Sequence, residues 1–211
     1  MSSEKNDFIS DLPRLIRRLA SDNQSWEGGQ PFSNGERAAL KRMNPVKDVF
    51  RPPVFWKIVC EYENQDGREL SKQRETAYAA VLQGMAITAD ECCSVSGENG
   101  RPIDFGTALG RYEGEQKRRG GGETVSRRFD QLLRARGERF FDLLRTLLRF
   151  TASKRIGFSW EKLAYLCLAE QEEKRSHVIS QLTRSFYAAV VFSSKTADDS
   201  ESEFNSSNKG E

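Results

Sequence analysis

Apolar residues recur every three or four positions along most of the chain, whereas the strict alternation typical of β-strands is weak. The clearest case is segment 71–87, SKQRETAYAAVLQGMAI, which is rich in strong helix formers. Ser33 precedes Glu36 by three residues, which is the spacing of a capping box at the start of a helix. Ser159 begins another periodic segment, 159–175, at a position where serine is a favoured N-cap. The pattern therefore predicts an all-α fold.

Turn-forming residues divide the expected helices into two groups. Segment 94–102, SVSGENGRP, consists largely of residues that favour turns, so we place a boundary there. We expect an N-terminal helical subdomain over residues 7–96 and a C-terminal helical bundle with a basic face over residues 103–194. From residue 196 onward the chain holds five acidic residues and one lysine, so residues 195–211 are expected to form an acidic disordered tail.

The C-terminal half carries three further local signals. Segment 103–112, IDFGTALGRY, predicts a short apolar helix or turn. Segment 114–124, GEQKRRGGGET, is expected to be a mobile loop, because three basic residues are followed by three glycines. Segment 176–192 predicts a last helix. The residues that this helix is expected to turn inward are Val178, Leu182, Phe186 and Tyr187.

Composition limits the class of protein. With 211 residues, of which 37 % are hydrophobic, the chain can bury a core in one domain or two small ones without disulfides. The N-terminus lacks the apolar core of a signal peptide, and no run approaches eighteen apolar residues, so we expect a cytoplasmic protein without a membrane partner. Four cysteines without a repeated spacing favour reduced thiols, and they are Cys60, Cys92, Cys93 and Cys167.

The net charge of +2 hides an uneven distribution. Residues 101–155 contain fourteen Lys or Arg and seven Asp or Glu, which gives a local charge of +7. Segment 126–150, SRRFDQLLRARGERFFDLLRTLLRF, holds seven of these arginines and only three acidic residues. Such a concentration of cations predicts an anion-binding surface.

The arginines of segment 126–150 follow a helical period. At 100° per residue the apolar side chains gather on one side of a helix, opposite a stripe of arginines. Gly137 interrupts the pattern, so we expect two helices, over about 124–135 and 138–150, each of which keeps its part of the stripe. The arginines of the stripe are Arg127, Arg134, Arg145 and Arg149.

This stripe has two interpretations. It is either the solvated face of amphipathic helices or a surface for phosphate groups, which the planar guanidinium fits well. Smaller basic groups elsewhere, taken together with the stripe, favour nucleic-acid binding. No aromatic residues are interleaved with these cations, so base-specific readout is not indicated. The smaller groups are Arg37, Lys41 and Arg42; Lys72 and Arg74; and Lys117, Arg118 and Arg119.

Residue types that carry catalysis or bind metals are scarce. His177 is the only histidine, and one histidine cannot supply the usual metal cluster. The glycines near residue 120 lack the Gly-x-x-x-x-Gly-Lys-Ser/Thr pattern of a phosphate-binding loop, and no carboxylate cluster of a two-metal nuclease is evident. We therefore expect a protein that is not an enzyme and that holds no cofactor or metal.

Seven short motifs follow one another along most of the chain. They are GERAALKRM, PVFWKIV, FGTALGR, RRFDQLLRAR, FFDLLRTLLRF, FSWEKLAYLCLAE and SFYAAV. In their order and spacing, from about residue 33 to residue 192, they resemble the small subunit of the type I-E CRISPR Cascade complex, the CasB family. No single motif is specific to this family, but the order and spacing of all seven are.

The resemblance implies an all-helical protein of two small subdomains without a known catalytic role. It implies two copies in a ribonucleoprotein of antiviral defence, in contact with the repeated backbone subunits and the large subunit. It also implies that basic faces help to hold the guide RNA (crRNA) assembly and the target DNA, especially the displaced non-target strand of the R-loop. Sequence recognition is then left to guide pairing.

The family's basic positions, carried over to this chain, fall on part of the stripe and on four further residues: Arg128, Lys174, Arg175 and, in a looser match, Arg74. The chain departs from the family's pattern at Gly137 and Thr146, where a basic residue is often found. The alternatives are a helical adaptor whose arginines dock an acidic protein partner, and an enzyme whose site is assembled by folding. The expected nucleic-acid-binding residues are Arg37, Lys41, Arg42, Arg74, Arg127, Arg128, Arg134, Arg145, Arg149, Lys174 and Arg175.

Overall fold

The computed structural model describes residues 8–20, 30–48, 50–63, 70–92, 102–120 and 124–195. Within these ranges the regular secondary structure is entirely α-helical, which confirms the predicted all-α fold. Apart from Lys195, the last residue of a helix, the predicted acidic tail lies outside the described residues. The described helices are α1 (Leu12–Leu19), α2 (Asn34–Arg42), α3 (Pro53–Glu63), α4 (Lys72–Cys92), α5 (Phe105–Arg118), α6 (Thr124–Arg134), α7 (Gly137–Ser153), α8 (Glu161–Leu168) and α9 (Glu172–Lys195).

Two helix ends lie where local sequence signals predict them. The Ser33 hydroxyl accepts a hydrogen bond from the Glu36 backbone N–H (3.2 Å), and the Glu36 carboxylate accepts one from the Ser33 N–H (2.9 Å), so α2 begins with a complete capping box. Helix α6 ends at Arg134 and α7 begins at Gly137, whose φ is +56°, which confirms the predicted break in the arginine segment.

Three expectations about the bounds of helices are wrong. Helix α5 continues through Arg118, because three glycine positions let it pack along α9, so residues 114–118 of the loop predicted for 114–124 are helical. The single helix predicted over 159–175 is two helices, and the backbone turns at the extended residue Ala169. Trp160, not Ser159, is the N-cap of α8, and it makes no side-chain capping bond.

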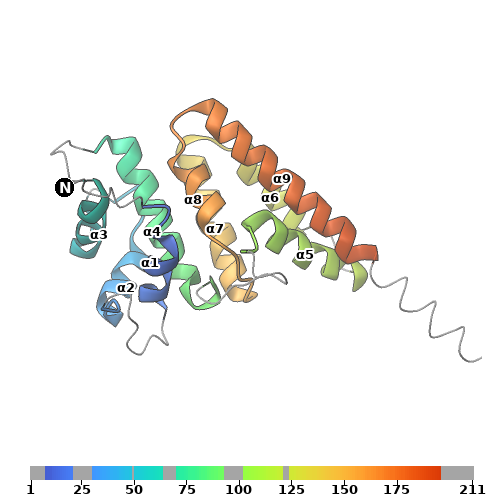
Figure 1. The fold of residues 1–211 in the computed structure, drawn as a ribbon, viewed down its shortest axis with the longest axis horizontal. Helices are drawn as coiled ribbons and strands as arrows, with labels where there is room; N and C mark the ends of the chain where they lie inside the picture. Colours follow the sequence, from blue (N-terminus) through green and yellow to red (C-terminus); the bar gives the residue numbers. More distant parts are fainter. Residues whose placement is uncertain are drawn as a thin grey trace, which may run out of the picture.

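Helix α4 lies at the centre of the fold. All residues from 77 to 86 are buried, because α1 and α2 pack on one part of its surface and α7 and α8 on another (Figure 1). The apolar core is continuous from α1 to α9 through this helix. Although α4 and α9 are long, none of the helices in the described ranges is apolar enough along its length to cross a bilayer.

Helices α5 and α9 approach each other so closely that no side chain fits between them at the glycine positions of α5. A Cβ atom on Gly106 would lie 2.3 Å from the carbonyl oxygen of Leu182, and one on Gly110 would lie 2.3 Å from that of Phe186. Both contacts join residues 76 apart in the sequence, so the two helices run in the same direction in a constant register. The glycines, spaced four residues apart, lie on one face of α5, and that face is the one that meets α9.

Asp104 fastens the start of α5 to two other helices. Its carboxylate accepts hydrogen bonds from the Thr107 N–H (3.0 Å), the Ser185 hydroxyl of α9 (2.8 Å) and the Lys162 ammonium of α8 (3.0 Å). Burial alone would raise the pKa of Asp104, but these donors outweigh it and lower the pKa. Asp104 is therefore a charged acceptor that holds the C-terminal helices in place.

Candidate nucleic-acid interface

The direction of α6 is set by a buried carboxylate. Glu113 of α5 is fully buried and accepts hydrogen bonds from the Val125 backbone N–H (3.2 Å) and the Ser126 hydroxyl (3.0 Å). The first N–H groups of a helix have no partner within the helix, and a negative charge there also interacts favourably with the helix dipole. Glu113 thus fixes where α6 begins, and with it the positions of Arg127 and Arg128 on the outer face.

Replacing Glu113 by alanine is expected to lower the free energy of unfolding by about 1–3 kcal/mol, because the buried N–H of Val125 loses its acceptor. Urea titration followed by circular dichroism measures this change. Glu115→Ala, on the exposed side of the same helix, is the control and should stay within about 0.5 kcal/mol of the parent protein. Equal stability of the two variants would show that Glu113 does not hold α6.

The arginine stripe lies on the outer face of α6 and α7. Arg127, Arg134 and Arg149 are exposed, and Arg145 is partly buried. None of these four side chains forms an ion pair or hydrogen bond with any residue that the structure describes, and the Nε atom of Arg145 is buried without a hydrogen-bond partner. Arg136, in the same segment but outside the stripe, pairs with Glu172 at 2.8 Å. The stripe therefore keeps its positive charge available to a ligand.

Arg128 joins the two helices of the stripe. It is exposed, and its guanidinium carbon lies 5.3 Å from the centre of the Phe150 ring at the end of α7. A cation over an aromatic face is held by the ring quadrupole without losing its charge. Arg128 is thus oriented beside the stripe and still faces solvent.

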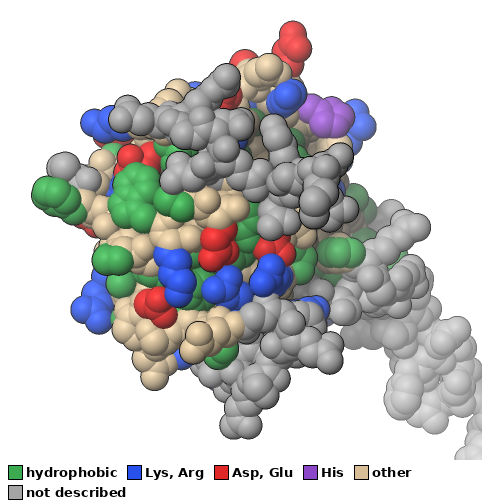
Figure 2. All heavy atoms as spheres, turned by 60° about the vertical axis from the view of Figure 1, so that its left-hand side comes forward, with side chains coloured by type: hydrophobic (Ala, Val, Ile, Leu, Met, Phe, Trp, Pro, Cys, Tyr) green, Lys and Arg blue, Asp and Glu red, His purple; other side chains and the backbone are tan. Residues whose placement is uncertain are grey.

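The basic residues on the α1–α3 side of the molecule have acidic neighbours. Figure 2 turns this side forward and shows a short row of Lys and Arg side chains with Asp and Glu side chains next to it. Ion pairs join Arg18 to Glu61 (3.8 Å) and Lys57 to Glu36 (3.8 Å). A surface of mixed charge attracts phosphate less than the α6–α7 stripe does.

The three predicted residues of α2 lie on this side. The guanidinium of Arg37 donates to the Leu19 carbonyl (3.4 Å) and to the Asn34 side chain, so it fastens α2 to α1. Lys41 and Arg42 are exposed in the last turn of α2. Their contact with nucleic acid stays a prediction.

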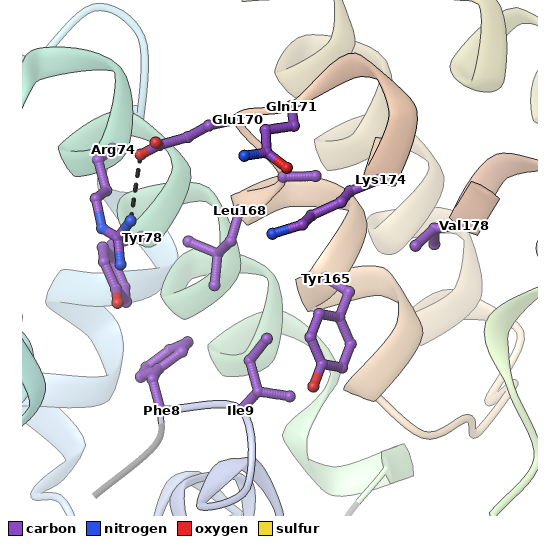
Figure 3. Close-up of a pocket in the computed structure, with 11 residues that line it drawn as sticks. Phe8, Ile9, Arg74, Tyr78, Tyr165, Leu168, Glu170, Gln171, Lys174 and Val178 are labelled. Carbon is purple, nitrogen blue, oxygen red and sulfur yellow. Dashed lines mark hydrogen bonds and ion pairs between the residues drawn. The ribbon is translucent and has the colours of Figure 1, made fainter. Parts of the chain in front are cut away.

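Arg74 and Lys174, 100 residues apart, meet at one pocket between α4 and the α8–α9 connection (Figure 3). The pocket has a volume of about 300 Å³, and its walls are mainly apolar, with Tyr78 and Leu168 among them. Arg74 pairs with Glu170 at 3.2 Å, whereas the side chain of Lys174 extends from α9 toward Leu168 (Figure 3). The structure thus brings these two predicted residues together, but away from the α6–α7 stripe.

Arg175 lies inside the protein rather than on a surface. Only 9 % of the residue is exposed, and its guanidinium donates to the carbonyl oxygens of Ala135 (3.1 Å) and Leu166 (3.4 Å) while it covers the Phe140 ring at 4.5 Å. Burial, with a smaller contribution from nearby Arg136, lowers its pKa. Arg175 therefore connects the ends of α6 and α8 to α9, and we leave it out of the proposed surface.

Tyr187 is a residue of the interface that sequence reasoning did not find. It was expected to point inward, but 44 % of it is exposed, and it lines a hollow beside Arg127 and Arg134. Its partner helix α6 lies more than fifty residues earlier in the chain, so no local pattern could place this aromatic next to the stripe.

The described residues contain no group of three or more metal-ligating side chains. His177 is exposed, and its Nε2 lies 2.8 Å from the Gln181 amide nitrogen one turn further along α9. Burial raises the pKa of the Cys167 thiol to about 12, so this thiol is protonated at neutral pH and is a poor nucleophile.

Comparison with known proteins gives one finding that bears on this surface. The sequence model of the family described as CRISPR-associated protein Cse2 matches residues 36–187, which are 152 of the 211 residues. The match spans the chain from α2 into α9 and includes every residue of the arginine stripe. No curated protein and no solved structure matches the chain.

Proposed function

Because the chain belongs to the Cse2 family of CRISPR-associated proteins, the small subunits of the type I-E Cascade complex, we propose that it is a non-catalytic subunit that holds a nucleic-acid backbone on the α6–α7 arginine stripe. The observation that carries this proposal is the lack of ion-pair partners for Arg127, Arg134, Arg145 and Arg149 among the described residues. Four cations on two rigid helices suit the regularly spaced charges of a phosphate backbone.

The strand that the stripe holds is, in this proposal, the displaced DNA strand of the R-loop, and the same subunit stabilises the guide RNA assembly. A backbone-reading surface suits that task, because base pairing with the guide carries the sequence information. The other partners are the backbone and large subunits of Cascade and a second copy of the chain. No step of this function requires a catalytic group.

The proposal predicts a measurable salt dependence. Three phosphate contacts on a single strand, made by the exposed Arg127, Arg134 and Arg149, should give a log–log slope of about −2.1, and affinity should then fall about twentyfold between 50 and 200 mM salt. Changing all three to glutamate should abolish binding. Titration of labelled single-stranded DNA, duplex DNA and single-stranded RNA with the full-length chain measures both effects. Arg145 is left unchanged, because its partial burial would add a packing defect.

A matched variant tests whether the loss of binding comes from the stripe itself or only from the change in the net charge of the protein. Arg14, Lys47 and Lys57 are exposed basic residues of the N-terminal half, and their change to glutamate alters the charge as much as the arginine variant does. This variant should keep most of the affinity. Equal loss in both variants, or no salt-dependent binding of the parent protein, would overturn the proposal, and the second result would favour a stripe that docks an acidic protein partner.

A further inference from the structure

The hollow beside the arginine stripe has the features of a nucleotide site. It lies where α6 passes α9, and its volume of about 640 Å³ falls within the range of about 300–1,000 Å³ that is typical of small-ligand sites. Its lining includes three cations, an amide and an aromatic ring, which are Lys117, Arg127, Arg134, Gln131 and Tyr187. The aromatic residues of α6 and α7 themselves are buried or only partly exposed, and they are Phe129, Phe140, Phe141 and Phe150.

The ring of Tyr187 is held in place and yet accessible. Its hydroxyl lies 3.2 Å from each carboxylate oxygen of Asp130 on α6, and it can donate to either. The neighbouring Phe186 packs at a right angle to the ring, with the centres 5.1 Å apart, and stacks on Phe129 of α6 at 4.6 Å. The ring is therefore fixed at its hydroxyl and at one side, while 44 % of the residue faces solvent.

The polar residues flank this ring along α6. Arg127 and Arg134 are seven residues apart, about 10 Å along the helix axis, and Gln131 lies between them on the same face. Neither arginine has a partner among the described residues, and the charge of Asp130, the one acid in the lining, already faces the Tyr187 hydroxyl. A strand that crosses the hollow would meet a cation on either side of the aromatic ring.

We propose that this hollow binds one nucleotide of the strand held by the stripe, with its base stacked on Tyr187 and its flanking phosphates at Arg127 and Arg134. The inference rests on the proposed function, because the strand must first be held by the arginines. Every base has an aromatic face, so stacking adds affinity without selecting a sequence. Gln131 is placed to donate to, or accept from, the edge of the stacked base.

Two oligonucleotides of equal length and charge separate stacking from phosphate binding. One is oligothymidylate, and the other carries abasic sites throughout and thus keeps the phosphates without the bases. The full-length chain should bind the first about tenfold more tightly, a factor within the range known for one base stacked on an aromatic side chain. Tyr187→Ala should remove this preference and leave the affinity for the abasic strand unchanged, whereas Tyr187→Phe, which keeps the ring, should retain most of it.

Tyr165 of α8 offers a matched control. It is exposed to the same degree, 45 % against 44 %, but it lines the separate pocket between α4 and the α8–α9 connection. Tyr165→Ala should bind both oligonucleotides as the parent protein does. Thermal melting of each variant checks that the fold is kept, as expected for an exposed side chain.

The outcomes distinguish this inference from the function on which it rests. If the parent protein binds both oligonucleotides equally, with the predicted salt slope, the stacking site is refuted and the backbone-holding function stands. An equal loss on both oligonucleotides in Tyr187→Ala also refutes it, because the tyrosine then acts only on the shape of the surface. If the parent protein binds neither strand in a salt-dependent way, the proposed function fails and the inference fails with it.

Discussion

Replacing Gly110 by leucine is expected to lower the free energy of unfolding by about 3 kcal/mol or more, although leucine is the better helix former. Even the first carbon of the new side chain would lie 2.3 Å from the Phe186 carbonyl oxygen and 2.9 Å from the Ala189 Cβ. A backbone oxygen cannot rotate away as a side chain can, so α9 must move off α5. Chemical denaturation followed by circular dichroism measures the loss.

Gly35 provides the control for this substitution. A Cβ at this position, in the first turn of α2, would meet no atom closer than 4.0 Å. Gly35→Leu should therefore keep or slightly increase stability, because the helix gains a better former by up to about 1 kcal/mol. If Gly110→Leu behaved in the same way as this control, α5 and α9 would not be packed at the distance described.

Local chemistry explains the parts of the fold that the sequence predicts correctly. The capping box of Ser33 and Glu36 and the break at Gly137 depend on neighbouring residues alone, and the structure has both. The position of the arginine stripe on the outer face also follows from helical periodicity, because the apolar side of each helix must turn toward the core. That these arginines contact a phosphate backbone stays a prediction.

The parts that could not be predicted depend on contacts between distant segments. Charge alone places Arg175 with the other basic residues, but its side chain is buried because α6, α8 and α9 meet around it. The spacing of the α5 glycines was visible in the sequence and is a signal of close helix packing. The sequence did not show that the partner helix would be α9 or that the two helices would run parallel, because the contacting residues are 76 positions apart.

The division into two subdomains stays a prediction, and α4 of the first range packs against α7 and α8 of the second. Trp160, at the start of α8, is only 3 % exposed, and its indole N–H donates to the Thr88 hydroxyl of α4 at 3.0 Å. Its ring also faces Gly84, where a Cβ atom would lie 2.4 Å from the indole. Trp160 is thus one of the buried side chains through which the predicted N-terminal and C-terminal units contact each other.

Trp160→Ala is expected to lower the free energy of unfolding by about 3–5 kcal/mol, because the loss of a buried tryptophan leaves a cavity. The Thr88 hydroxyl also loses the hydrogen bond that the indole N–H donates to it. Trp56→Ala is the control, because Trp56 is 42 % exposed, and its loss should stay near 1 kcal/mol. Urea unfolding followed by circular dichroism compares the two. If residues 7–96 and 103–194 fold as separate units, the Trp160 variant should unfold in two steps, because a large buried contact between them is gone. A single transition at lower urea would instead show one cooperative unit. A loss no greater than that of the control would contradict the buried position of Trp160 between α4 and α8.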